Sequence, residues 1–259
     1  MKKYWVMGDI HGDYLPVKDF YIKHKDELSQ DPRDNILVLL GDVGANYFFN
    51  ERDSRFKKNL EKLPFSYFCI RGNHEQRPSI IYNQNPQEWH TDIQFNNVVY
   101  VENKYDRIYY ALDAGGIYWI NNKKILVLPG AYSVDKDYRL KVGWSWFPEE
   151  QMSLDEFTWI LGISADQHFD IVLSHTCPLS WQTYISDLFL NQVDQSKVDN
   201  HMEQKLEAIS HKITWDRWYF GHYHSDRDIP AEKATMLFHQ ALPFGISISE
   251  YNSMLFDFS

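Results

Sequence analysis

Cysteine is scarce in this chain of 259 residues, which contains only Cys69 and Cys177. Two cysteines allow one disulfide at most, and this count excludes the bridge-rich scaffolds typical of small secreted proteins. No apolar run is long enough to span a bilayer, and the N-terminus enters a predicted strand within three residues, without an apolar signal core. We therefore expect a protein of the cytoplasm that has no membrane partner.

Positive charge is also in short supply, because 26 basic residues stand against 36 acidic ones and the net charge is −10. Such a surface repels polyanions, which disfavours a dedicated nucleic-acid binder but leaves room for a local basic cleft. The 44% hydrophobic and 16% aromatic content suffices for a substantial core. Long linkers and solenoid repeats are absent, so we expect a single domain over residues 1–259.

Short apolar runs recur along the chain, and most end in polar junctions that contain glycine. They cover 4–7, 35–44, 65–75, 169–178 and 215–224, and they are typical of strands buried on both faces. Helical patterns are predicted over 15–28, 51–63, 148–162 and 200–211. Strands that alternate with helices predict an α/β layered sheet.

The middle of the chain, residues 98–134, is rich in β-formers and poor in helical patterns. We interpret it as hairpins that join the first sheet to a second one. One hairpin should turn at Asn121 and Asn122, since an Asn pair between two apolar runs favours a two-residue turn. Further short strands are expected in the tail, over 236–258.

Chemically active side chains stand where the predicted strands end. The five groups are Asp9 with His11, Asp42 after Gly41, Asn73-His74-Glu75 after Gly72, His175 after Ser174, and His222 with His224 after Gly221. Strand ends of a layered α/β sheet converge on one edge, the usual place for a ligand. Imidazole and carboxylate ligands suit Mn²⁺, Fe²⁺, Zn²⁺ or Ni²⁺. Seven such groups are too many for one tetrahedral ion and suit a pair of ions that share a carboxylate.

In order and spelling these groups resemble the signature of the calcineurin-like metallophosphoesterase superfamily: D-x-H, G-D, G-N-H-[ED], a lone His and G-H-x-H. All five blocks occur here in that order between Asp9 and His224. The resemblance implies a four-layer α/β/β/α sandwich of two mixed sheets flanked by helices, with a metal site at the C-terminal ends of the strands.

The resemblance also implies roles for individual residues. Asp9, His11 and His224 would hold one divalent ion, Asn73, His175 and His222 the other, and Asp42 would bridge the two. His74 would be the catalytic histidine and not a ligand. Manganese is the expected metal, with iron, zinc or nickel as alternatives.

The function implied is hydrolysis of phosphate monoesters (a phosphoprotein, a nucleotide or a small ester) by attack of a metal-bridging hydroxide. The alternative is a phosphodiesterase or nuclease of the same fold that acts on cyclic nucleotides or nucleic acid. A non-catalytic scaffold is disfavoured, because every ligand position and His74 are filled. The oligomeric state is not predicted.

The residues expected to bind the substrate differ in part from those of the enzymes whose motifs are most similar. Arg71 in the stretch RGNHE resembles the phosphate-gripping arginine of protein Ser/Thr phosphatases and diadenosine tetraphosphatases. The Asp-Arg-Gly that follows the bridging Asp in those enzymes is absent, because the chain continues from Asp42 as Val-Gly-Ala-Asn. Arg139, expected far from any helix interior, and Arg77 are candidates to replace the missing arginine, with a surface position as the alternative for each.

Two acidic residues beside the motifs each have two possible roles. Asp13 either orients His11 or belongs to a turn. Glu75 either holds a ligand histidine in one tautomer or caps a following helix.

Overall fold

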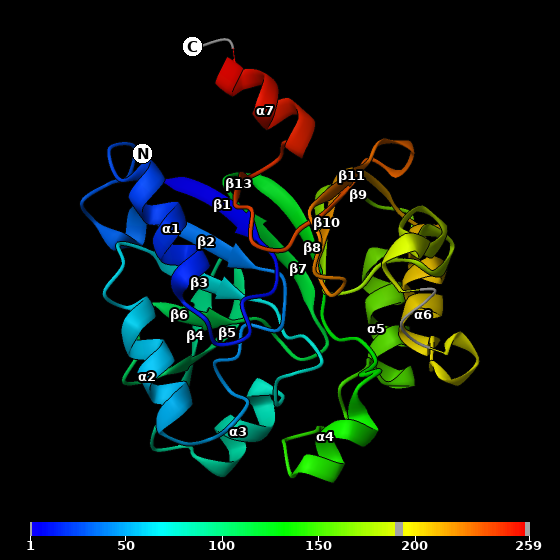
Figure 1. Cartoon of the computed structure of the whole chain (residues 1–259), viewed down its shortest axis with the longest axis horizontal. Coiled ribbons are helices and arrows are strands. Elements are labelled where there is room, and N and C mark those ends of the chain that lie inside the picture. Colours follow the sequence, from blue (N-terminus) through cyan, green and yellow to red (C-terminus); the bar gives the residue numbers. More distant parts are fainter. Residues whose placement is uncertain (1, 190–193, 257–259) are drawn as a thin grey trace.

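Two mixed β-sheets face each other at the centre of the computed structural model, which describes residues 2–189 and 194–256 (Figure 1). The first sheet has the order β13 (Leu242–Pro243), β1 (Lys3–Met7), β2 (Asn35–Leu39), β3 (Ser66–Cys69), β6 (Ile108–Tyr110), β5 (Asn97–Glu102) and β4 (Trp89–Gln94). The second has the order β11 (Arg227–Ile229), β12 (Ala234–Met236), β10 (Thr214–Phe220), β9 (His168–Ser174), β8 (Lys123–Leu128) and β7 (Gly116–Ile120). The predicted fold class is confirmed.

Both sheets are parallel in their middle and antiparallel at their edges. Strands β1, β2, β3 and β6 run parallel in the first sheet, and β8, β9, β10 and β12 run parallel in the second. Parallel strands end at the same edge of a sheet, so the loops after β1, β2, β3, β9 and β10 are available to one site.

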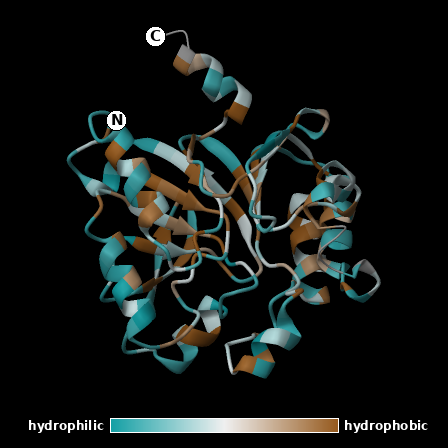
Figure 2. Ribbon diagram, in the orientation of Figure 1, coloured by the Kyte–Doolittle hydropathy of each residue, from teal (hydrophilic) through white to brown (hydrophobic). Residues whose placement is uncertain are grey.

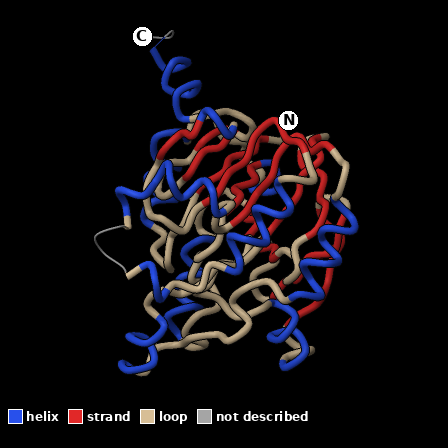
Figure 3. The backbone as a smooth tube through the Cα atoms, turned by 90° about the vertical axis from the view of Figure 1, so that its right-hand side faces the viewer, coloured by secondary structure: helices blue, strands red, loops and turns tan. Residues whose placement is uncertain are grey.

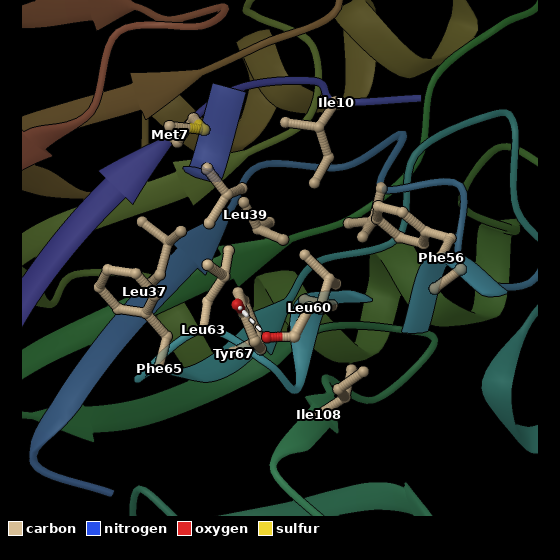
Figure 4. Close-up of a cluster of buried hydrophobic side chains, with 14 of the residues drawn as sticks. Met7, Ile10, Leu37, Leu39, Phe56, Leu60, Leu63, Phe65, Tyr67 and Ile108 are labelled. Atoms are coloured by element: carbon tan, nitrogen blue, oxygen red, sulfur yellow. Dashed lines mark hydrogen bonds between the residues drawn. The ribbon is translucent and has the colours of Figure 1, made fainter. Parts of the chain in front are cut away.

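The first sheet is buried on both faces because successive side chains of a strand point in opposite directions. Leu37 and Leu39 of β2 face the outer helices α1 (Leu15–His24) and α2 (Glu51–Leu60), where Phe56 and Leu60 pack beside them (Figure 4). Val38, between them in sequence, packs instead in the core that lies between the two sheets. In Figure 2 strand β2 is largely brown, the colour of hydrophobic residues.

The outer face of the second sheet is covered by α5 (Leu154–Ser164), α6 (His201–Ser210) and the 3₁₀-helical segment Leu179–Leu188 (Figure 3). Ile160, Leu206 and Trp181 bring these elements into one core with β9 and β10. Helices therefore flank the pair of sheets on both sides, as the resemblance implied.

The hairpin predicted at Asn121 and Asn122 is confirmed. Ile120 pairs with Lys123, and both turn residues have positive φ angles, 54° and 59°. Two consecutive residues of this kind form the turn that matches the twist of an antiparallel pair.

The helix predicted over 148–162 is wrong at its start, because α5 begins only at Leu154. The Ser153 hydroxyl accepts a hydrogen bond from the amide of Glu156, and the Glu156 carboxylate accepts one from the amide of Ser153. This capping box determines the start of the helix more strongly than Pro148 does. The other three predicted helices are present as α1, α2 and α6.

The tail contains the short strands β12 and β13, but its last part is a helix, α7 (Ile248–Phe256), where strands were predicted. Another capping pair explains the helix, because the Glu250 carboxylate and the Ser247 hydroxyl exchange hydrogen bonds with each other's backbone amides. Two short helices, α3 (Pro78–Gln84) and α4 (Lys136–Val142), were not predicted.

Within the described part of the chain, no helix combines the length and the apolar character that crossing a membrane requires. Cys69 and Cys177 are both free and buried.

Candidate metal centre

The loops that follow five parallel strands bring all seven predicted ligands to one place. Asp9 and His11 follow β1, Asp42 follows β2, Asn73 follows β3, His175 follows β9, and His222 and His224 follow β10. Ligand atoms gather within 4.8 Å of one another in three groups: Asp9–His11–His224, Asp42–His175–His222 and His11–Asp42–His74. The first group contains the three residues predicted for one ion, and the second contains two of the residues predicted for the other ion together with Asp42. The third group includes His74, which was not expected to be a ligand. The assignment of ligands to ions stays a prediction.

The donor atoms of these groups face one another across short distances. His11 Nε2 lies 2.8 Å from His224 Nε2, and His175 Nε2 lies 2.9 Å from Asn73 Oδ1. His175 Nε2 is also 3.4 Å from Asp42 Oδ1. Convergence of imidazole nitrogens with carboxylate and amide oxygens is the donor chemistry of divalent transition ions, so these residues fit the expected pair.

Four of the seven candidate ligands have strained backbones. Their φ angles lie in the left-handed region, which residues other than glycine rarely adopt. The values are 45° for His11, 44° for Asp42, 71° for His222 and 51° for His224. Each such residue costs on the order of 1–3 kcal/mol and persists where the surroundings hold it. Four strained residues among seven candidate ligands indicate that ligand placement has been favoured over local stability.

Glycine precedes four of the seven ligands. At three of these glycines, Gly41, Gly72 and Gly221, a ligand from another motif occupies the space that a side chain would need. A Cβ on Gly72 would lie 2.0 Å from Asp42 Oδ1, and one on Gly221 would lie 2.1 Å from Asp9 Oδ1. The glycines therefore allow segments distant in sequence to approach closely, and they explain the G-N and G-H spellings of the motifs.

Buried charges shift the pKa values of the side chains in this centre. Burial opposes protonation of His175, but the charges of Asp42 and Asp9 raise its pKa to about 9. Burial, joined by the charge of His175, lowers the pKa of His222 to about 3. Burial would raise the pKa of Asp42, yet the neighbouring histidines hold it well below its usual range. Metal ligands must be deprotonated, so metal uptake at this centre releases protons.

Glu75 supports the ligand loops in a way that neither interpretation from the sequence described. Its Oε1 accepts hydrogen bonds from the backbone amides of Gly44 (3.1 Å) and Ala45 (3.4 Å). The carboxylate thus braces the loop that carries Asp42 and neither caps a helix nor bonds a histidine. Burial and the charge of Asp42 raise the pKa of Glu75 to about 7. Asp13 follows the turn interpretation, because its Oδ1 accepts from the amide of Leu15 at the start of α1.

His74 lies between two carboxylates at the edge of the centre. Its backbone amide donates to Asp42 Oδ1 (2.8 Å), and its Nε2 lies 4.0 Å from Asp42 Oδ2 and 3.8 Å from Asp135 Oδ2. Burial lowers the pKa of His74, against the opposing charge of Asp42. Asp135 was not predicted, since no spacing in the sequence connects it with His74.

Arg139 lies inside α4, so the expectation that it sits far from any helix interior is wrong. Its side chain is buried, with 0% exposure. Nε lies 3.0 Å from Asp135 Oδ1, a guanidinium nitrogen donates to the Ser145 carbonyl (3.3 Å), and another lies 3.9 Å from Glu150. Arg139 therefore reaches the centre through Asp135, the neighbour of His74.

The other two candidate arginines are also engaged by the protein. Arg71 is buried and donates to the carbonyl oxygens of Gly72 (3.2 Å) and Glu150 (2.7 Å). Arg77 pairs with Glu156 and donates to two backbone carbonyl oxygens. The predicted contacts of Arg71, Arg77 and Arg139 with a substrate phosphate stay predictions.

Ser133 and Glu150 form a support for Asn73 that the sequence did not reveal. Asn73 Nδ2 donates to Ser133 Oγ (3.0 Å), and the Ser133 amide donates to Glu150 Oε1 (2.9 Å). With its nitrogen held in this way, the amide of Asn73 presents its oxygen to His175 and the proposed ion.

Comparison with known proteins adds a family match. The family model described as calcineurin-like phosphoesterase matches residues 2–226. No curated protein matches the chain. Among the 47 matching chains of solved structures is the phosphopantetheinyl hydrolase (PptH) from Mycobacterium tuberculosis. It has 12% identity and a TM-score of 0.43, and the match covers 92% of this chain and 88% of that one.

Proposed function

The chain belongs to the calcineurin-like phosphoesterase family and is a metal-dependent hydrolase, and from this premise we propose that it hydrolyses phosphate monoesters. The observation that carries the proposal is the convergence of six of the seven proposed ligands, from four strand ends, into the groups described above. The seventh, Asn73 after β3, places its Oδ1 2.9 Å from His175 Nε2. We assign one ion to Asp9, His11 and His224 and the other to Asn73, His175 and His222. Asp42 contributes to both.

Two divalent ions bound here would lower the pKa of a water molecule and neutralise charge on the phosphoryl oxygens. The chain's own residues supply the rest. His74 donates a proton to the oxygen of the leaving alcohol, a step that typically contributes about a hundred- to ten-thousandfold. Burial lowers the pKa of His74, and the negative charge of a bound phosphate would favour its protonated form.

Asp135 and Arg139 have a positioning role in this proposal. The Asp135 carboxylate lies between His74 and the Arg139 guanidinium, at 3.8 Å and 3.0 Å. It is therefore close enough for its negative charge to act on the imidazole of His74. Arg139 keeps Asp135 in place, and direct contact of Arg139 with phosphate would require its buried side chain to move.

One observation favours the diesterase alternative. Arg77 and Arg139 face acidic side chains, and Arg71 is buried with one of its guanidinium nitrogens bonded to backbone carbonyls. A monoester dianion gains more from a free guanidinium than a diester monoanion does. Comparison of p-nitrophenyl phosphate with bis(p-nitrophenyl) phosphate, with Mn²⁺ present and after chelation, tests both functions. Faster metal-dependent turnover of the monoester supports our proposal, and faster turnover of the diester contradicts it.

Manganese as the preferred ion, the cytoplasmic location and the single domain over 1–259 are kept as predictions.

A further inference from the structure

A cavity of about 230 Å³ adjoins the candidate metal centre and has no role in the hydrolysis described above. Its lining includes the ligand residues His222 and His224 together with Glu203 of α6. The walls are largely apolar or aromatic and include Tyr132, Val134 and Phe189. A group in this cavity would be directly beside a phosphate held at the two ions.

Glu203 is the unusual residue of the lining. It is only 4% exposed, and its Oε1 accepts a hydrogen bond from the Thr176 hydroxyl (2.8 Å). Its Oε2 is buried and has no hydrogen-bond partner among residues 2–189 and 194–256. A buried carboxylate oxygen without a donor is costly, and such atoms are rare in folded proteins.

The polar neighbours of Glu203 are already bonded to one another. The Thr176 and Tyr223 hydroxyls lie 3.0 Å apart, and the Gln182 side-chain amide donates to Tyr223 (3.1 Å). These groups therefore leave Oε2 without a donor.

The lining selects among the organic groups that a phosphate ester can carry. A phosphotyrosine ring fits aromatic walls but brings no donor, since its oxygen is esterified. A sugar has hydrogen-bond donors, but its hydroxyl groups point in all directions and would be left without partners against walls that are largely apolar. A nucleobase is flat, stacks on aromatic side chains and carries N–H donors on its edge. The volume is below the 300–1,000 Å³ or so of sites for drug-sized ligands and suits one ring system.

We propose that the cavity binds the base of a nucleoside phosphate, with a base N–H donating to Glu203 Oε2 while the phosphate lies at the ions. This inference rests on the proposed function and specifies its substrate class. Burial raises the pKa of Glu203, and a donor to Oε2 would favour the charged carboxylate again.

Guanosine 5′-monophosphate is a suitable probe because guanine has adjacent N–H donors on one edge. The kcat/KM of the enzyme for this nucleotide is compared with its kcat/KM for glycerol 3-phosphate and for p-nitrophenyl phosphate. The wild type should prefer the nucleotide over glycerol 3-phosphate at least about tenfold. In Glu203→Gln the ratio of kcat/KM for the nucleotide to that for p-nitrophenyl phosphate should fall about tenfold, because a hydrogen bond to a charged group is lost.

Glu207→Gln is the matched control, since Glu207 lies on the same helix and bonds Ser180 outside the cavity lining. It should keep the wild-type ratio. An unchanged ratio in Glu203→Gln, or an equal loss on both substrates, would overturn the proposal. If Glu203→Gln does not fold by circular dichroism, Tyr132→Ala should give the same loss of ratio, and an unchanged ratio there would overturn it too.

Calorimetric titration with guanosine, which has no phosphate, separates this inference from the proposed function. If the wild type hydrolyses none of the three esters, the proposed function fails. Guanosine binding that weakens in Glu203→Gln would still support the base site. Absence of guanosine binding to the wild type would overturn it, whatever the hydrolysis results.

Discussion

Replacement of Gly221 by alanine tests how closely the strand-end loops must approach to form the metal centre. The new Cβ would lie 2.1 Å from Asp9 Oδ1, whereas ordinary contacts begin at 3.4 Å. The two atoms would have to separate by 1.3 Å, and the backbone amide of His222, which donates to Asp9, would move with them. A misplacement of about 1 Å in an active site can cost roughly a hundredfold in rate. We expect such a loss in kcat/KM for p-nitrophenyl phosphate, together with weaker binding of the ion held by Asp9.

Metal content by mass spectrometry and kcat/KM measured on the same preparation provide the assay. Gly162→Ala is the matched control, because Gly162 lies in α5 with no atom within 4 Å of an added Cβ. It should keep full activity and gain about 0.5–1 kcal/mol in stability, as alanine does over glycine inside a helix. Wild-type activity and metal content in Gly221→Ala would refute the argument that close approach at this glycine positions Asp9.

Three further predictions concern single side chains. His74→Asn should retain about two ions while kcat falls by about a hundred- to ten-thousandfold, and less for the good leaving group p-nitrophenol; loss of an ion would show that His74 is a ligand. In metal-free protein, His11→Gly should be more stable than His11→Ala by about 1 kcal/mol in urea unfolding, because φ at this position is 45°; equal stability would argue against strain. The folded-state pKa of Glu203 is raised above its ordinary 4.5, so its contribution to the unfolding free energy is lost as pH rises from about 4.5 through the folded pKa. Urea unfolding of metal-free Glu203→Gln should therefore show a smaller decline over that range than the wild type, and parallel pH profiles would contradict the raised pKa.

The parts of the fold that the sequence predicted well are those in which local pattern and tertiary environment agree. Strands β2 and β9 end in apolar runs, Ile36–Leu39 and Ile171–Leu173. The predicted ligands follow shortly after these runs, so the order of motifs indicated where to look for the site. Asn121 and Asn122 form a turn whose geometry depends on neighbouring residues only.

The secondary-structure predictions were wrong where a helix cap or a distant contact decides the structure. Ser153 with Glu156 and Ser247 with Glu250 begin helices at positions that apolar periodicity did not indicate. Helix α4 is short, and even its large apolar side chain Tyr138 is exposed. Its sequence therefore has no apolar stripe from which the helix could be predicted.

The support of the site depends on contacts between residues far apart in the sequence. Asp135 meets His74 and Ser133 meets Asn73 only because the segment after β8 folds back over the loop after β3. A single sequence contains no spacing that reveals such a meeting. The burial of Arg139 depends on nearer parts of the chain, because Asp135 lies one helical turn before it and Glu150 lies on the loop that follows α4.

The central claim, that two ions held by the strand-end ligands carry out the hydrolysis, is tested most directly by titration of chelated protein with Mn²⁺. Bound metal and turnover of p-nitrophenyl phosphate are followed together, in the wild type and in Asp42→Asn. We predict that activity is absent without metal, rises to its maximum as the second ion binds, and stays low in Asp42→Asn because a neutral amide bridges two cations poorly. Full activity in the chelated wild type, or saturation with a single ion, would contradict the account.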